Sequence, residues 1–143
     1  MTEITLLLVK WQSQQSELKA LREQVFVIEQ HVPADLEWDG LDEAATHLLA
    51  VNAANQAVAC ARILPDGTIG RMAVLKQWRG LGIGRAVLNR AITFCKTQGL
   101  SSVHLSAQKH ALGFYAEAGF VVTSSEYMDA GIAHYDMKFD ISD

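Results

Sequence analysis

The stretch Trp78-Arg79-Gly80-Leu81-Gly82-Ile83-Gly84-Arg85 predicts the fold of this chain more directly than any other. It follows an apolar run, residues 69–74, typical of a strand, and precedes an amphipathic segment, residues 86–94, typical of a helix. Glycines let the backbone approach a ligand closely, and the free amides at a helix start attract anions. The stretch therefore predicts a phosphate-binding turn, with Arg79 and Arg85 adding positive charge at its two ends.

Two other phosphate-binding motifs fit these residues poorly. A dinucleotide fold needs G-x-G-x-x-G near the start of a βαβ unit and an acidic residue about 20 residues later. Here the spacing is G-x-G-x-G and the motif lies in mid-chain. A nucleoside triphosphatase loop ends in Gly-Lys-Ser/Thr, whereas Gly84 is followed by Arg85 and Ala86. The remaining structural alternative is a glycine-rich turn that only connects a strand to a helix.

The pattern R-x-x-G-x-G in Arg79, Gly82 and Gly84 resembles the acyl-coenzyme A pyrophosphate loop of the GNAT N-acetyltransferase superfamily. Phe114-Tyr115-x-x-x-Gly119-Phe120 is similar to a second signature of that family. Other segments resemble its ElaA-like branch and, with these two, cover most of the chain in order: Leu21-Arg22-x-x-Val25-Phe26-Val27-x-Glu29-Gln30, Ala61-Arg62-Ile63-Leu64, Ile69-Gly70-Arg71, Ala107-Gln108-x-His110 and Gly131-Ile132-Ala133-His134. Two departures are Gly113, inside a predicted helix, and Ala133, where the branch often has proline.

Composition limits the classes of protein to which the chain can belong. Its 143 residues, half of them apolar, suit one domain with a sizeable core. The formal net charge of -4 argues against nucleic acid as a partner. We expect no membrane span, no secretory signal after Met1-Thr2-Glu3 and no metal site. Cys60 and Cys95 lie in apolar surroundings and are predicted to be free buried thiols, so a cytoplasmic location is expected.

The acidic residues gather in one short stretch of the chain, at Glu37, Asp39, Asp42 and Glu43. Charge alone favours a solvated loop. The functional alternative is a negative funnel that attracts a cationic amine.

Periodicity, proline and glycine predict the order of the elements. A helix capped by Ser13 or Ser16 is expected to run to about Ile28, with Leu18, Leu21, Val25 and Ile28 on one face. The other expected segments are strands at 4–9, 48–52, 58–64, 68–74, 103–106, 120–123 and 134–139, helices from the glycine stretch to 96 or 97 and over 107–118, a turn at Pro65-Asp66-Gly67, a helix end at Gly99 and a loop around Asp129-Ala130-Gly131. Together with the resemblance, this order predicts an α+β, GNAT-like fold. We expect one N-acetyltransferase domain over residues 1–143, with a mixed, mostly antiparallel sheet of about seven strands and helices packed on both faces.

The resemblance implies that acetyl-CoA is the cosubstrate. The cofactor-binding residues it implies are Arg79, Gly80, Leu81, Gly82, Ile83, Gly84 and Arg85, which hold the pyrophosphate, and the backbone of Met72, Ala73 and Val74, which pairs with the pantetheine arm. In the family this strand is splayed by a bulge, which leaves a backbone amide near Val74 facing the thioester carbonyl. Periodicity alone favours an ordinary core strand for these three residues.

Acyl transfer needs an acid for the departing thiolate and a base for the amine. Tyr115 matches the general acid of the family, and the alternative is a tyrosine that anchors a helix to the sheet through its satisfied hydroxyl. For the base, Glu29 and Glu126 rank first and His134 next, ahead of Asp39 and His47. Arg62 either meets an anionic group of the acceptor or pairs with an acid on the sheet.

The predicted activity is the acetyl-CoA-dependent transfer of an acetyl group to a primary amine by direct attack in a ternary complex. The acceptor is a small-molecule or peptide amine. One alternative is an acyltransferase resembling acyl-homoserine lactone synthases, to which Arg22-x-x-Val25-Phe26 and the later acidic residues are similar. Another is a non-catalytic coenzyme A-binding sensor. A homodimer paired through the last strands is a further possibility.

Overall fold

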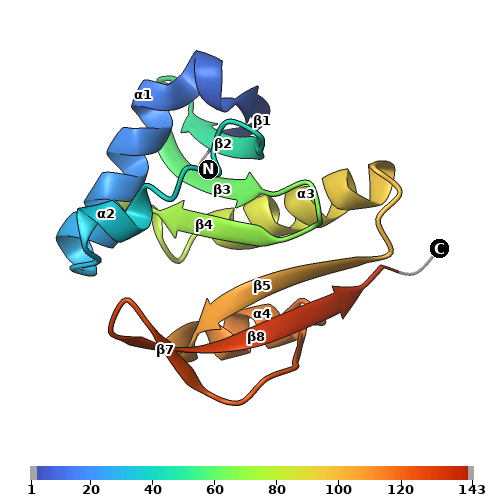
Figure 1. Ribbon diagram of the computed structural model, residues 1–143. Helices are drawn as coiled ribbons and strands as arrows, with labels where there is room; N and C mark the ends of the chain where they lie inside the picture. Colours follow the sequence, from blue (N-terminus) through green and yellow to red (C-terminus); the bar gives the residue numbers. More distant parts are fainter. Residues whose placement is uncertain (1–2, 142–143) are drawn as a thin grey trace.

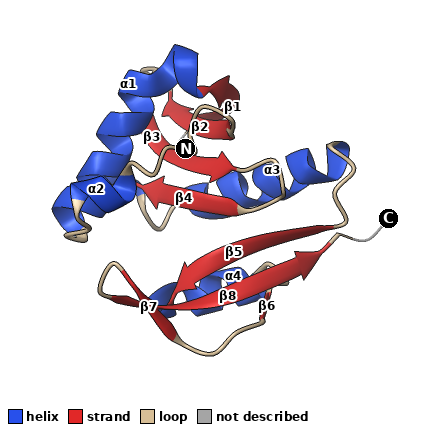
Figure 2. Cartoon of the chain, viewed as in Figure 1, coloured by secondary structure: helices blue, strands red, loops and turns tan. Residues whose placement is uncertain are grey.

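The computed structural model describes residues 3–141 of the chain. Residues 1–2 and 142–143 of the expected domain lie outside the described residues, and so does the start of the chain, where no secretory signal is expected. The elements, in chain order, are β1 (Ile4–Lys10), α1 (Trp11–Arg22), η1 (Glu23–Glu29), α2 (Ala34–Glu37), β2 (Thr46–Asn52), β3 (Ala57–Ile63), β4 (Ile69–Val74), η2 (Lys76–Trp78), α3 (Ile83–Thr97), β5 (Ser102–Gln108), η3 (Lys109–Ala111), α4 (Leu112–Glu117), β6 (Val121–Val122), β7 (Tyr127–Asp129) and β8 (Ile132–Asp140). Figure 2 shows how these helices and strands follow one another.

The strands form two four-stranded antiparallel sheets. The first has the order β1-β2-β3-β4, and the second has the order β5-β8-β6, with β7 also paired to β8. A parallel bridge between Thr68 and His104 joins them, supported by the His104 amide, which donates to the Gly67 carbonyl at 3.0 Å. The expected mixed and mostly antiparallel α+β arrangement is therefore confirmed, with eight strands where about seven were predicted.

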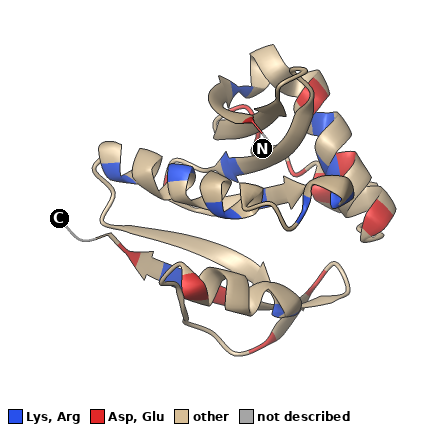
Figure 3. Ribbon diagram, turned by 180° about the vertical axis from the view of Figure 1, so that it is seen from behind, with Lys and Arg blue, Asp and Glu red and all other residues tan. Residues whose placement is uncertain are grey.

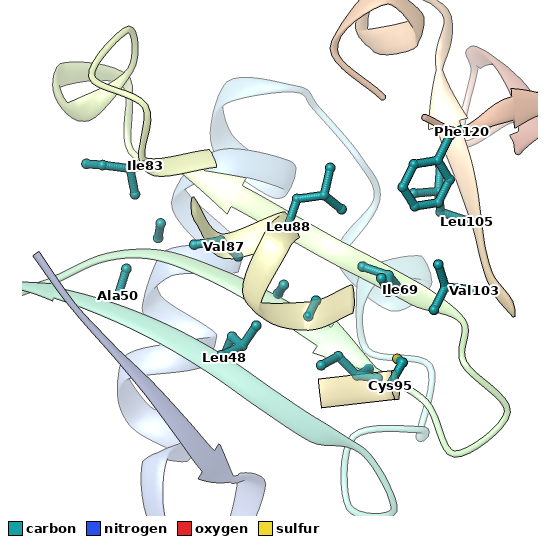
Figure 4. Close-up of a cluster of buried hydrophobic side chains, with 14 of the residues drawn as sticks. Leu48, Ala50, Ile69, Ile83, Val87, Leu88, Cys95, Val103, Leu105 and Phe120 are labelled. Atoms are coloured by element: carbon teal, nitrogen blue, oxygen red, sulfur yellow. The ribbon is translucent and has the colours of Figure 1, made fainter. Parts of the chain in front are cut away.

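Helices cover both faces of the first sheet. Along β2, Leu48 and Ala50 belong to the core under α3, whereas Leu49 and Val51 belong to the core under α1, as expected where successive side chains of a strand point to opposite faces. Figure 4 shows Val87 and Leu88 of α3 among the side chains of the larger core. Because both faces are covered, β2 and β3 read as nearly continuous apolar runs.

The second sheet has a different cover. Its core side chains, among them Leu105, Phe120 and Met137, belong to the same cluster as α3, and α4 lies on this side, behind β5 and β8 in Figure 1. The face of the first sheet opposite α3 is covered by α1 (Figure 1). The opposite face of the second sheet carries polar side chains from β5 and β8: His104, Ser106, Gln108, His134, Asp136 and Lys138. We call this set the polar face.

Most predicted elements are confirmed to within a few residues. The hairpin turn at 65–67 forms as expected: Gly67 has a φ of 91°, and its amide donates to the Leu64 carbonyl at 3.0 Å. Gly99, with a φ of 80°, follows the last turn of α3, and the Leu100 amide donates back to the Cys95 carbonyl at 3.2 Å. This is the left-handed ending that the sequence predicted.

The first helix differs from its prediction. It begins at Trp11 after Lys10, with no side-chain cap, and it ends at Arg22; Ser13 instead donates its hydroxyl to the Lys10 carbonyl at 3.1 Å. The chain then continues as a π-helix, η1. The wider turn shifts the positions that follow it, so Ile28 is 55% exposed rather than on the buried face.

The predicted helix over residues 107–118 was wrong at its start. Ala107 and Gln108 extend β5 and pair with Tyr135 and His134 of β8, so strand pairing overrides the local helix preference. The helix itself is short and contains residues 112–117. The predicted loop around Ala130 is a tight hairpin between β7 and β8, because Ala130 and Gly131 both have positive φ, 53° and 76°.

The acidic stretch is not a fully solvated loop: Glu37 and Asp42 are buried, Asp39 is exposed but ion-paired, and Glu43 is exposed. Arg22, which is 1% exposed, donates to Glu37 Oε2 at 2.8 Å and to Asp42 Oδ1 at 2.6 Å. Arg62 pairs with Asp39 through both terminal nitrogens, at 2.8 and 2.9 Å. Sequence spacing does not reveal this pairing, because α1, β3 and the loop meet only in the folded chain.

The two cysteines are free and buried, one in each core. Burial raises the pKa of the Cys60 thiol to about 12, and burial also raises the pKa of the Cys95 thiol. Both thiols therefore stay protonated at neutral pH.

Candidate active site

The glycine stretch forms an open turn at the start of α3. Gly80 and Gly82 have φ values of 77° and 82°, which lie in the left-handed region that favours glycine. A Cβ on either residue would have no atom within 4 Å. The first helical bond runs from the Ala86 amide to the Gly82 carbonyl at 3.1 Å, so the amides just before Ala86 have no acceptor within the helix.

The charge of α3 favours an anion at this turn. The helix spans 15 residues and carries Arg85, Arg90 and Lys96 but no acidic residue. Blue segments are seen along the helix in Figure 3. The helix dipole adds positive potential at its N-terminus. Open space, free amides and basic side chains are the features that a diphosphate site needs.

The adjacent strand β4 contains the bulge that the family resemblance implied. Its pairing with β3 shifts register between Cys60 and Arg62, and Arg71 has a φ of 48° at this point. Beyond the bulge, the Leu75 amide donates to the Val58 carbonyl of β3 at 2.9 Å. Because successive amides of a strand point in opposite directions, the Val74 amide faces away from β3.

The Val74 amide therefore points toward the region where β4 and β5 separate. The two strands are bridged near their starts, at Thr68 and His104, and diverge toward their ends in Figure 1. Gly84 of α3 lies beside this opening: a Cβ there would sit 3.5 Å from the Phe114 ring of α4 and 3.7 Å from Val74 Cγ2. The glycine turn, the end of β4 and α4 are thus brought together.

Tyr115 lies on α4 with its ring packed against the larger core. Its ring makes edge contacts with Phe114 and Phe120, with centroids 5.1 and 5.9 Å apart. Within residues 3–141 its hydroxyl has no hydrogen-bond partner, unlike the hydroxyls of Tyr127 and Tyr135. Burial raises the pKa of Tyr115 to about 12, so the phenol keeps its proton at neutral pH.

Arg79, predicted to meet the pyrophosphate, contacts other groups in the structure. Its Nε donates to the Val74 carbonyl at 2.9 Å. Its two terminal nitrogens donate to the two carboxylate oxygens of Glu29 at 2.7 and 2.8 Å. This paired guanidinium lowers the pKa of Glu29, which makes Glu29 a weaker base than an ordinary glutamate.

Arg85 has a looser partner. It donates to Glu117 Oε2 at 2.8 Å, where the Glu117 side chain is 74% exposed, and its guanidinium lies over the Phe114 ring at 5.8 Å. An exposed single pair of this kind contributes little free energy. Arg85 is therefore the arginine of the turn that can exchange its partner for a phosphate.

His134 lies on the polar face, at the end of the second sheet nearest to η1. Its Nδ1 is 2.7 Å from the Ile132 carbonyl, and since a carbonyl only accepts, Nδ1 is the donor in this contact; in the neutral ring Nε2 is then the nitrogen with the lone pair. The ring stacks on Tyr127 with centroids 6.0 Å apart. Gln108, the partner of His134 in the sheet, donates to Gln30 Oε1 at 2.8 Å.

Glu126 lies apart from His134. Its carboxylate accepts from the Tyr135 hydroxyl at 3.0 Å and lies 3.3 Å from Lys109 Nζ, and both contacts lower its pKa. Tyr135 follows His134 directly, so their side chains leave opposite faces of β8. His134 therefore lies on the polar face and Glu126 lies near the opposite face, whereas Glu29 is held by Arg79 near the end of β4.

Three further candidates belong to the ion-pair cluster that joins Arg22 and Arg62 to Glu37, Asp39 and Asp42. Asp39 and Arg62 pair with each other, and His47 Nε2 lies 3.0 Å from the Asp42 carbonyl. Of the two roles proposed for Arg62, the structure shows pairing with acids. The sequence reasoning missed Gln30, Gln108 and Tyr127 as neighbours of His134, although Gln30 and Gln108 lie inside segments that resemble the family. Only strand register and the π-helix bring them together.

Comparison with known proteins gives a consistent result. The model of the acetyltransferase (GNAT) domain family matches residues 11–141. The chain is 34% identical over 123 residues to an uncharacterized N-acetyltransferase of Bacillus subtilis, YjcF, covering 84% of this chain and 88% of that protein. It is 32% identical over 137 residues to ElaA of Escherichia coli, covering 90% of this chain and 89% of ElaA.

Solved structures agree with the sequence matches. The crystal structure of E. coli ElaA superimposes with a TM-score of 0.84 at 30% identity, covering 98% of this chain and all of that chain. A crystal structure described as a putative N-acetyltransferase from Lactobacillus plantarum gives a TM-score of 0.88 at 24% identity, covering 96% and 97% of the two chains, and shows the shared fold. The chain therefore belongs to the GNAT family of acetyltransferases, and its relatives include the ElaA-like branch that its sequence resembles.

Proposed function

We propose that this protein transfers an acetyl group from acetyl-CoA to a primary amine by direct attack in a ternary complex. The single observation that carries the proposal is the open glycine turn with free helix amides next to the bulged end of β4. A turn that only connected a strand to a helix would need neither the open space at Gly80 and Gly82 nor the bulge.

The proposed cofactor site uses the turn and the strand. The amides of residues 80–84 and the exchangeable Arg85 bind the diphosphate. The backbone groups of residues 72–74 that face away from β3, the Val74 amide among them, pair with the pantetheine arm as an added strand would. The thioester supplies an acyl carbon that an amine can attack. The Val74 amide faces the parting of β4 and β5, where it stabilises the oxyanion that this attack creates.

The acid and the base lie on opposite sides of that parting. Tyr115, on the α4 side, keeps its proton at neutral pH and donates it to the departing thiolate. His134, on the polar face, has its Nε2 lone pair free and removes a proton from the incoming amine. This arrangement ranks His134 above Glu29 and Glu126, because both carboxylates are held by cations and have lowered pKa values.

The acceptor is a small-molecule or peptide amine that reaches the reacting carbon from the polar face. Asp136 lies on this face and accepts a hydrogen bond from the Tyr127 hydroxyl at 2.6 Å. Its exposed carboxylate favours an acceptor that arrives as an ammonium ion.

Within residues 3–141, no helix is both long enough and apolar enough to cross a membrane.

Calorimetric titration tests the proposal directly. The protein is titrated with acetyl-CoA and, separately, with adenosine diphosphate and NAD. We expect acetyl-CoA to bind and NAD not to bind, with adenosine diphosphate binding more weakly because it lacks the pantetheine arm. Failure of acetyl-CoA to bind a folded protein would contradict the proposal. A screen of amines, read by thiol release, then identifies the acceptor.

A further inference from the structure

The contacts of Arg79 point to a role other than phosphate binding. Three of its nitrogens already donate within the protein: Nε to the Val74 carbonyl and the two terminal nitrogens to Glu29. The Glu29 pair is bidentate, the geometry in which a guanidinium matches a carboxylate best. The contact with Val74 fixes the orientation of the guanidinium plane as well as the position of its charge.

We infer that Arg79 is a positioning residue that fastens the end of β4 to the π-helix η1, so that the cofactor turn and the acceptor side move as one unit. The inference rests on the proposed function for its consequence in catalysis. Glu29, on this account, is the second half of the fastening and not the general base.

The two ends of this fastening both matter to the proposed site. Val74 carries the amide that faces the thioester, and a strand residue's N–H and C=O point to the same side. Holding the Val74 carbonyl therefore also fixes the direction of its amide. Glu29 is the last residue of η1, and the next residue, Gln30, bonds to Gln108 beside His134. Arg79 thus links the proposed oxyanion donor to the neighbours of the proposed base.

The π-helix explains why Glu29 reaches Arg79. The Gln30 amide donates to the Val25 carbonyl at 3.1 Å, one residue further along the chain than in an α-helix. π-helical turns are rare and concentrate at functional sites. The wide turn changes the direction of Glu29, and the fastening to Arg79 contributes to holding the turn.

In the opposite interpretation, Arg79 is a phosphate ligand, and Glu29 pairs with it only while no cofactor is bound. The two views predict opposite signs for one substitution. If Glu29 competes with phosphate, Glu29→Gln frees Arg79 and tightens acetyl-CoA binding. If Glu29 and Arg79 hold the site together, Glu29→Gln loosens it, and we expect affinity to fall by about threefold or more. Tightened or unchanged affinity in calorimetry would overturn the inference.

Arg79 itself gives a second test through side-chain geometry. Lysine keeps the charge but loses the planar fork. A phosphate ligand acting as a point charge would be rescued by Arg79→Lys relative to Arg79→Gln. A positioning fork is not rescued, so we expect the two variants to lose acetyl-CoA affinity to the same extent. Recovery in the lysine variant would contradict the inference.

Hydrogen exchange tests the fastening without any ligand. In the free protein, Arg79→Gln is expected to speed amide exchange in residues 23–29, and Glu29→Gln in residues 74–79, each by about threefold or more. Lys138→Gln removes a cation paired with exposed Asp140 and serves as the charge-matched control, which leaves both segments unchanged. Unchanged exchange in the Arg79 and Glu29 variants would overturn the inference. Because no cofactor is present, this result is independent of whether acetyl-CoA binds, which the unsubstituted protein decides.

Discussion

Gln30 and Gln108 lie 78 residues apart in the sequence, and Gln108 Nε2 donates to Gln30 Oε1 at 2.8 Å. The contact ties the end of η1 in the first half of the chain to the end of β5 in the second. It spans the side of the molecule where β4 and β5 part. The proposed acceptor side is therefore built from both halves of the chain, and substitutions in either half are expected to affect it.

Gly82→Asp is expected to abolish acetyl-CoA binding. The substitution places a carboxylate where the diphosphate is proposed to lie, and the two negative charges repel. Because a Cβ at Gly82 has no atom within 4 Å, the protein is expected to stay folded despite the φ of 82°. Gly82→Asn is the matched control, with the same size and a similar tolerance of left-handed φ but no charge. If calorimetry shows equal losses for Asp and Asn, charge is not the cause.

Tyr115→Phe is expected to remove turnover while keeping the cofactor. Loss of a general acid lowers kcat by about 100-fold or more, while acetyl-CoA affinity is expected to change by less than about twofold because the ring packing stays. Thiol release and calorimetry give the two values. Tyr135→Phe, which removes a hydroxyl bonded to exposed Glu126, is the control. A Tyr115→Phe protein with normal turnover would favour the sensor alternative or a different acid.

His134→Gln is expected to lower kcat by about 100-fold. The amide retains a donor for the Ile132 carbonyl but supplies no base. Glu126→Gln keeps the shape and removes the charge of a carboxylate near the other face of β8, and we expect it to leave kcat nearly unchanged. The reverse ranking, with Glu126→Gln the slower enzyme, would restore Glu126 as the candidate base.

Acid is expected to destabilise the fold through His47. Desolvation, the largest cause, lowers the pKa of this buried imidazole, so the folded protein prefers it neutral. Below the unfolded value of about 6.5 the unfolded chain binds the extra proton more readily, and the free energy of unfolding falls as pH falls. Urea titrations at pH 7.5 and pH 5 measure this loss. It should shrink in His47→Gln and persist in His110→Gln, where the histidine is exposed; equal losses in all three proteins would exclude His47 as the source.

Two glycines near α4 are expected to respond in opposite directions to alanine. Gly119 has a φ of 105°, and a Cβ there would lie 2.8 Å from Phe139 Cε2, so Gly119→Ala is expected to destabilise by about 1–3 kcal/mol. Gly113 has no neighbour within 4 Å of its ideal Cβ. Gly113→Ala should stabilise by about 0.5–1 kcal/mol through lower unfolded-state entropy. Chemical denaturation gives both values, and a shift of the same sign in both variants would contradict this reading of the two sites.

The sequence predicted the fold where local signals and the final contacts agree. The run ending at Val74, the glycine turn and α3 were all anticipated, because left-handed glycines and an amphipathic helix are encoded within a few neighbouring residues. Ala107 and Gln108 were assigned to a helix because their pairing with β8 depends on residues far along the chain. Ile28 was predicted to be buried because an α-helical period was assumed through residue 28. The local sequence contains no signal for the π-helical turn.

The site was less accessible from sequence than the fold. The resemblance supplied the candidate residues, but the sequence gives no information about which carboxylate a guanidinium will choose. Arg79 holds Glu29, and Arg62 holds Asp39, across separations that no periodicity links. Strand alternation, visible only once the register of β8 is known, separates Glu126 from His134 and changes the ranking of the bases.

The burial of Cys60 and Cys95 has a practical consequence for the thiol-release assays proposed above. Released coenzyme A is measured with reagents that colour on reaction with a thiolate, and neither protein thiol is expected to ionise or admit such a reagent while the fold is intact. The absorbance therefore measures released coenzyme A alone, and no correction for the thiols of the enzyme is needed. The same property reports unfolding. A rapid initial reaction of two thiols per chain would show that a variant had unfolded, so that its lower rate would not be attributed to a lost catalytic group.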